Sequence, residues 1–106
     1  MSVPKDDRSA IRRVIRALKR VGAKPVTLWG GEDYNTPLTT FGEKMVLDMV
    51  FDYDDCQLTF EDNDNHHITL RLVMGNDPDE VVCDWWPCND GILSQTVDKE
   101  TESWWD

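Results

Sequence analysis

Residues 43–86 read EKMVLDMVFDYDDCQLTFEDNDNHHITLRLVMGNDPDEVVCDWW and decide the fold. Apolar and polar side chains alternate here in four runs, the period of strands with one buried face. The runs predict strands over 44–53, 56–61, 68–74 and 80–86. The turns between them are rich in Asp, Asn, Gly and Pro, which favour turn backbone. Connections this short join antiparallel neighbours, so the stretch predicts a β-meander.

Eight apolar side chains are predicted to share the inner face of this meander. Their burial would stabilise the domain by roughly 12–24 kcal/mol, taken as an upper bound. They are Leu47, Met49, Phe51, Leu58, Phe60, Ile68, Leu70 and Leu72. An apolar face of this size needs a covering layer from elsewhere in the chain.

The covering layer is predicted in a helix that starts near Asp6 or Asp7 and ends at Gly22. Either aspartate can cap the helix, and glycine is the usual residue just past a helix end. The apolar residues of this segment recur at the i, i+3, i+4 and i+7 spacing of one helix face. They are Ile11, Val14, Ile15, Leu18 and Val21.

The remaining segments predict smaller elements. Residues 25–29 (PVTLW) predict a short strand at a sheet edge, where proline is tolerated. Residues 32–42 have no clear period and are interpreted as a loop. A short second helix is predicted to start at 92–97, followed by a weak helix or tail. The whole chain, 1–106, is therefore predicted to be one two-layer α+β domain, an N-terminal helix on an antiparallel meander of four to five strands.

The net charge of −10 is divided unevenly along the chain. Residues 1–44 hold nine Lys and Arg against five Asp and Glu, whereas residues 45–106 hold two against sixteen. Such asymmetry indicates either a charged binding face or a basic helix lying against an acidic sheet.

The main candidate surface is formed by the acidic residues of the sheet and turns, together with tryptophans. The carboxylates of one strand are too widely spaced to match the charge density of nucleic acid, but those of the strands and turns together come closer to it. The surface is therefore predicted to be a partial nucleic-acid mimic. Tryptophan dominates protein–protein hot spots, although the C-terminal pair can instead fold back onto the core. The candidate partner-binding residues are Asp48, Asp52, Asp54, Asp55, Glu61, Asp62, Asp64, Asp84, Trp86, Trp104 and Trp105.

An alternative surface is the basic face of the N-terminal helix, which could meet nucleic-acid phosphates. Its candidate residues are Arg12, Arg13, Arg16, Lys19 and Arg20. The acidic remainder of the chain would repel a polyanion, so direct nucleic-acid binding is the second hypothesis. The simplest alternative is a solvated helix face that is partly neutralised by the acids of the same chain.

No catalytic motif is present, and no enzyme activity, cofactor or metal is predicted. The cysteines lack a cationic setting that would activate them as nucleophiles. Cys83 and Cys88 are separated by four residues that include a predicted strand end and a proline, and His66 and His67 are adjacent and would point to opposite faces of a strand, so a zinc site is not predicted. Residues 62–73 begin like a calcium loop but lack its glycine and its final glutamate.

The three cysteines are interpreted as reduced and buried thiols, because they cannot all pair with one another. No signal peptide and no apolar run of about 20 residues is recognised. The expectation is therefore a cytoplasmic protein that does not bind membranes.

In size and acidity the chain resembles small phage-encoded inhibitors of host defence or of host nucleic-acid enzymes, and toxin-neutralising immunity proteins. No motif carries this resemblance, and it assigns no residue. It implies a non-enzymatic inhibitor that acts stoichiometrically on a basic surface of a partner protein, such as a nucleic-acid-binding enzyme or complex. The location would be the host cytoplasm if the protein is phage-encoded. A homodimer paired through the edges of the sheet is left open.

Overall fold

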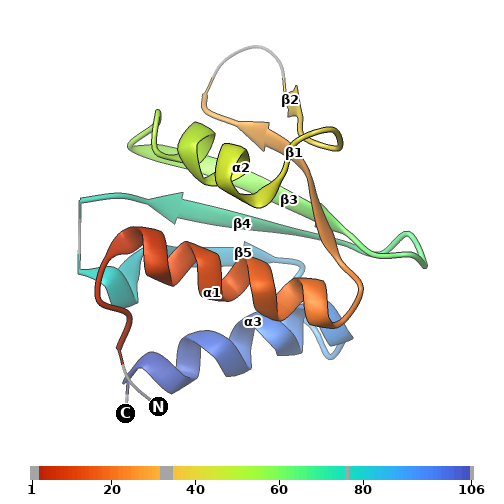
Figure 1. The fold of residues 1–106 in the computed structure, drawn as a ribbon. Coiled ribbons are helices and arrows are strands. Elements are labelled where there is room, and N and C mark those ends of the chain that lie inside the picture. The colour runs from red at the N-terminus through yellow and green to blue at the C-terminus, as the bar shows by residue number, and fades with distance from the viewer. Residues whose placement is uncertain (1–2, 32–34, 76, 106) are drawn as a thin grey trace.

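The computed structural model describes residues 3–31, 35–75 and 77–105, and it shows three helices and a five-stranded sheet (Figure 1). The elements in chain order are α1 (Asp7–Arg20), β1 (Lys24–Trp29), β2 (Thr36–Pro37), α2 (Glu43–Val50), β3 (Asp55–Glu61), β4 (His67–Val73), the 3-10 turn η1 (Pro78–Glu80), β5 (Val82–Trp86), α3 (Ile92–Glu102) and the 3-10 turn η2 (Ser103–Trp105).

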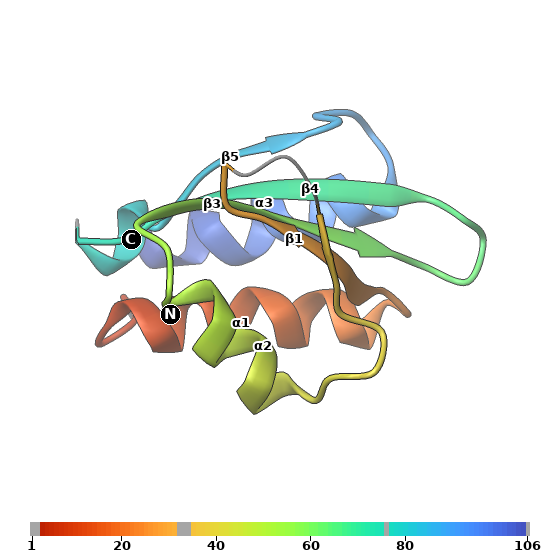
Figure 2. The ribbon, with the colours of Figure 1, turned by 90° about the horizontal axis from the view of Figure 1, so that it is seen from above.

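The sheet is antiparallel, with strand order β2-β1-β3-β4-β5. All three helices lie on one side of it, so the molecule has two layers (Figure 2). The predicted two-layer α+β fold, with an N-terminal helix, a five-stranded antiparallel sheet and a short C-terminal helix, is confirmed. The opposite face of the sheet carries no helix among the described residues.

Helix α1 forms as its sequence predicts. The Asp6 side chain accepts a 2.7 Å hydrogen bond from the Ser9 amide at the start of the helix. Val21 ends the helix, and Gly22 follows with a φ of +90°, a conformation that glycine adopts without strain. The apolar stripe of α1 is buried against the sheet, through Ala10, Ile11, Val14, Ile15, Ala17 and Leu18.

Helix α2 occupies the segment in which a strand was predicted, so the strand over 44–53 is wrong. The buried residues of α2 are Val46, Leu47 and Val50, a helical spacing. Met45 and Phe51, which a strand would have placed inside with Leu47, are 50% and 37% exposed. The segment has apolar residues at both odd and even positions, so its pattern fits the helical period as well as the strand period. Its Glu, Lys, Met and Leu residues have high helix propensity and favour the helix.

The other three strands of the meander form where the alternation predicts them, as β3, β4 and β5. Leu58 of β3 lies opposite Leu70 of β4, and Phe60 lies opposite Ile68, so one side of this hairpin is uniformly apolar. Helix α3 and the η2 turn close the core beside them with Leu93, Val97 and Trp104.

Strand β1 is not at the edge of the sheet, contrary to prediction, because β2 pairs with it on the outside. The register of β1 against β3 shifts between Pro25 and Thr27, which is where the proline is accommodated. The segment predicted as a loop therefore contains a two-residue strand, Thr36–Pro37, while its residues 32–34 lie outside the described part of the chain.

Candidate functional site

The outer face of the sheet is left open by the helices of the described residues (Figure 2). Thr59 and Thr69 face each other across β3 and β4, and their hydroxyl oxygens lie 2.9 Å apart. Trp86 of β5 pairs with Thr69 and is 41% exposed, while Trp29 of β1 pairs with Gln57 and is 36% exposed. This face thus presents a polar floor between two exposed indoles.

A shallow groove of about 510 Å³ lies on this face, at the end where β3 begins and β5 passes its bulge. Gln57 and Arg71 are neighbours across β3 and β4, and Arg71 lies opposite Asp84 on β5. The residues of the groove that bear on binding are Trp29, Asp55, Gln57, Arg71, Asp84 and Trp86. Its walls are therefore aromatic and its charged groups are mainly carboxylates.

Arg71 is held in place by Asp55. Its Nε and one terminal nitrogen donate to the two carboxylate oxygens of Asp55, at 3.1 and 2.6 Å. This bidentate bond lowers the pKa of Asp55 below its usual value and raises that of Arg71. The pair is exposed, so it fixes geometry more than it adds stability.

Asp55 and Asp84 line the groove, and Asp52 and Asp54 lie in the connection from α2 to β3; we name these four carboxylates the acidic rim. All four residues are exposed. Asp55 is engaged by Arg71, and one oxygen of Asp84 accepts a 2.8 Å hydrogen bond from the Trp85 amide. Among the described residues that line the groove, Arg71 is the one cation, and it faces two carboxylates.

The other predicted acids of the sheet are Glu61, at the end of β3, and Asp62 and Asp64, in the β3–β4 turn, about 20 Å along β3 from Asp55. Asp62 accepts hydrogen bonds from the amides of Asp64 and His66, both at 2.9 Å, and from the His66 ring at 3.1 Å. Glu61 lies 3.5 Å from His67. Partial burial raises the pKa of Asp62, but the donated bonds outweigh it and the pKa is below the usual value. Asp62 therefore holds the turn together.

Asp48 does not belong to the sheet surface, contrary to prediction, because it lies on α2 in the helical layer. Its carboxylate accepts from Arg8 at 2.9 Å and from Lys44 at 3.1 Å. The hydrogen bond from Arg8, followed by that from Lys44, lowers the pKa of Asp48. This carboxylate is thus used to pair α1 with α2.

The basic face of α1 is also paired within the chain. Arg12, Arg16 and Lys19 approach the single Glu43 carboxylate of α2 at 3.5, 3.1 and 3.7 Å. They occupy one helix face because they are four and three residues apart. Arg20 lies 3.9 Å from Glu100 of α3, and Arg13 is half-buried on the same helix.

The C-terminal tryptophan Trp104 is not an interface residue, contrary to prediction. It is fully buried, and its indole nitrogen donates to Glu100 at 2.9 Å. The acidic tail therefore folds back onto the core. The side chain of Trp105, another predicted contact, lies outside the described part of the structure.

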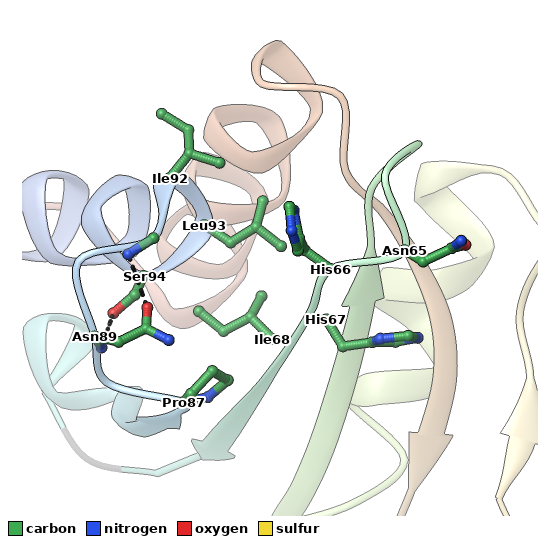
Figure 3. Close-up of a pocket in the computed structure, with 10 residues that line it drawn as sticks. Asn65, His66, His67, Ile68, Pro87, Asn89, Ile92, Leu93 and Ser94 are labelled. Atoms are coloured by element: carbon green, nitrogen blue, oxygen red, sulfur yellow. Dashed lines mark hydrogen bonds between the residues drawn. The ribbon is translucent and has the colours of Figure 1, made fainter.

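A pocket of about 440 Å³ separates the β3–β4 turn from the start of α3 (Figure 3). On the side next to α3, the Asn89 amide donates to the Ser94 hydroxyl at 3.2 Å, and the Gly91 amide donates to the Asn89 side chain at 2.8 Å. His67 points away from α3 in Figure 3. These contacts close the turn that leads into α3.

Among the residues that the structure describes, two clusters could supply three ligands each to a cation, and both lie largely at the surface. They are Asp62, Asp64 and His66, and Asp77, Asp79 and Glu80, with ligand atoms within 4.8 Å of one another. In the first cluster the Asp62 oxygens already accept the bonds of the turn. The sequence pattern identified this turn, but not the approach of His66 to Asp62.

The cysteines are not all buried, contrary to prediction. Cys56 is buried on β3, whereas Cys83 and Cys88 are exposed. Burial, reinforced by the Asp55 charge, raises the pKa of Cys56 to about 12, and burial also raises that of Cys83. An unreactive Cys56 is consistent with a packing role.

We expect an aromatic disulfide reagent at pH 8 to react rapidly with two of the three thiols of the folded protein. Cys56 should react only after unfolding, because its thiolate is both shielded and disfavoured. The measurement is a count of fast thiol equivalents with and without denaturant. Three fast equivalents in the native protein would show that β3 is not buried as described.

The sequence alone does not identify Trp29, Gln57 and Arg71 as parts of one site. Their meeting depends on the register that sets Gln57 between Trp29 and Arg71, and register is not visible in the composition of single strands.

Among the described residues, no helix is long and apolar enough to cross a membrane. Comparisons with protein-family models, with curated proteins and with solved structures give no match to this chain.

Proposed function

We propose that the protein is a non-enzymatic binding protein that acts stoichiometrically and engages a basic surface of a partner protein through its acidic rim. The observation that carries this proposal is the division of charge between the layers. Three cations of α1 converge on Glu43, and Arg8 bonds to Asp48. Among the described residues that line the groove, Arg71 is the one cation, and its guanidinium is bonded to Asp55.

The groove adds a second support for this proposal. Exposed tryptophan is uncommon on a surface that remains in water, and it is enriched where proteins bind one another. Trp29 and Trp86 lie beside the carboxylates rather than on a separate face. Acidic and aromatic groups together favour a cationic protein surface as the partner.

An inhibitory action follows from the chemistry of such a partner. A protein surface that binds nucleic acid is basic, because it neutralises phosphates. Carboxylates held on a rigid sheet can occupy that surface and exclude the nucleic acid. This is the phage-type or immunity-like inhibition that the size and acidity of the chain suggested.

The test is affinity capture from a cell extract with the wild-type protein and with Asp52→Asn/Asp54→Asn/Asp84→Asn, which leaves Asp55 in place to hold Arg71. We expect nucleic-acid-binding proteins to be captured, to be released by duplex DNA, and to be recovered at least tenfold less by the variant. Equal recovery of the same proteins by both would overturn the proposal.

The second candidate function is direct nucleic-acid binding by α1, favoured by the exposure of the Arg16 and Arg20 side chains, 61% and 72%. Its test is retention of the wild-type protein on immobilised duplex DNA at low salt. Retention that is lost in Arg16→Gln/Arg20→Gln would support this function. Failure of the wild-type protein to be retained would exclude it.

A further inference from the structure

We infer that the groove between Trp29 and Trp86 binds arginine side chains of the partner's basic surface, an inference that rests on the proposed function. It names the chemical group that is recognised and the residues that recognise it. The groove, its two indoles and its carboxylates lie on one open sheet face.

The two indoles are too far apart to sandwich one side chain. Trp29 lies on β1 and Trp86 on β5, so β3 and β4 separate them, and three strand spacings amount to about 14 Å. Each ring can instead cover one guanidinium, since a cation is attracted to an indole face within about 6 Å. The groove therefore suits a segment with more than one arginine, lying across the strands.

The carboxylate that would pair with an incoming arginine is Asp84. Both oxygens of Asp55 are already bonded to Arg71, which neutralises that guanidinium. Among the described residues, one oxygen of Asp84 accepts a hydrogen bond, from the neighbouring Trp85 amide. Asp84 is exposed, it lines the groove, and it lies two residues from the exposed indole of Trp86.

Arginine fits this surface better than lysine or a nucleotide does. The guanidinium is flat, stacks on aromatic rings and offers several donors to a carboxylate, whereas the lysine ammonium is a compact, strongly hydrated charge. A nucleobase can also stack on an indole, but the phosphates of a nucleotide would be repelled by Asp55 and Asp84, which line the groove.

The inference can be tested by calorimetric titration with the peptide acetyl-(Gly-Arg)4-amide, in which alternate residues of an extended chain carry the guanidinium on one side. The comparison ligands are the same peptide with citrulline, the same peptide with lysine, and the oligonucleotide dT8. We expect arginine to bind tightest, lysine several-fold weaker, and citrulline and dT8 at least tenfold weaker. Tightest binding of dT8 would overturn the inference in favour of base stacking.

The matched variants are Trp86→Ala and Asp84→Asn in the groove, with Phe41→Ala as an equally exposed aromatic control outside it. We expect each groove variant to bind the arginine peptide about fivefold more weakly, and the control to bind like the wild type. Unchanged melting temperatures would show that the variants are folded. Trp29→Ala serves as a third groove variant; it lies on β1, an inner strand of the sheet, whereas Trp86 lies on the edge strand β5.

The outcomes separate this inference from the function on which it rests. If the tryptophan variants bind as the wild type does while Asp52→Asn/Asp54→Asn/Asp84→Asn binds more weakly, the groove is not the arginine site but the acidic rim still binds cations. If none of these changes weakens binding, both the inference and the proposed function fail.

Discussion

Replacing Trp104 with alanine is expected to lower the free energy of unfolding by about 3–5 kcal/mol, close to the largest cost of a single core substitution. The indole is fully buried in the core shared by α3 and the sheet. Truncation leaves a cavity and also leaves Glu100 without the hydrogen bond from the indole. The check is denaturant unfolding, followed by circular dichroism.

Two further variants make this result specific. Trp104→Phe keeps most of the packing but loses the bond to Glu100, so it should fall between the wild type and the alanine variant. Trp86→Ala removes an indole that is 41% exposed on the outer face of the sheet and should change stability by less than about 1 kcal/mol. If Trp104→Ala were as stable as Trp86→Ala, the C-terminal segment would not be packed into the core.

Replacing Val50 with aspartate is expected to cost about 4 kcal/mol or more, because it places an unpaired charge in the core. Val50 faces inward only if residues 43–50 are helical. The matched control is Met45→Asp, at a half-exposed position of the same helix, which should change stability by less than about 1 kcal/mol. Thermal melts of both variants give the ranking.

The ranking of these two variants distinguishes helix from strand in this segment. A strand over 44–53 would bury Met45 with Leu47 and expose Val50. Met45→Asp would then be the damaging change, and Val50→Asp would be tolerated. That reversed order would contradict the structure of α2.

The elements that sequence could predict are those in which one period dominates. Leu58 and Phe60 alternate cleanly with polar residues, as do Ile68, Leu70 and Leu72, and these runs form β3 and β4. The apolar stripe of α1 is just as clean. In α2, Val46 and Val50 fit a helical period, while the residues between and around them alternate as in a strand. Both periods are therefore present, and tertiary packing determines that the segment is a helix.

The candidate site was predicted in part for the same reason. The acids of the turns could be recognised from composition, but the change of α2 from strand to helix moved Asp48 to the opposite layer, beside Arg8. The groove depends on pairings across four strands, and the burial of Trp104 depends on where α3 ends. Neither is local in sequence.

The central claim, that binding resides in the acidic rim and not in net charge, is tested most directly by comparing two variants of equal charge. Asp52→Asn/Asp54→Asn/Asp84→Asn removes three rim charges, and Asp90→Asn/Asp98→Asn/Glu102→Gln removes three exposed charges from α3 and its approach. The measurement is the equilibrium affinity of each for a captured partner at about 50 and 200 mM salt. The rim variant should bind at least tenfold more weakly than the wild type and depend less on salt, while the α3 variant stays within about twofold. Equal weakening by both variants would contradict the claim.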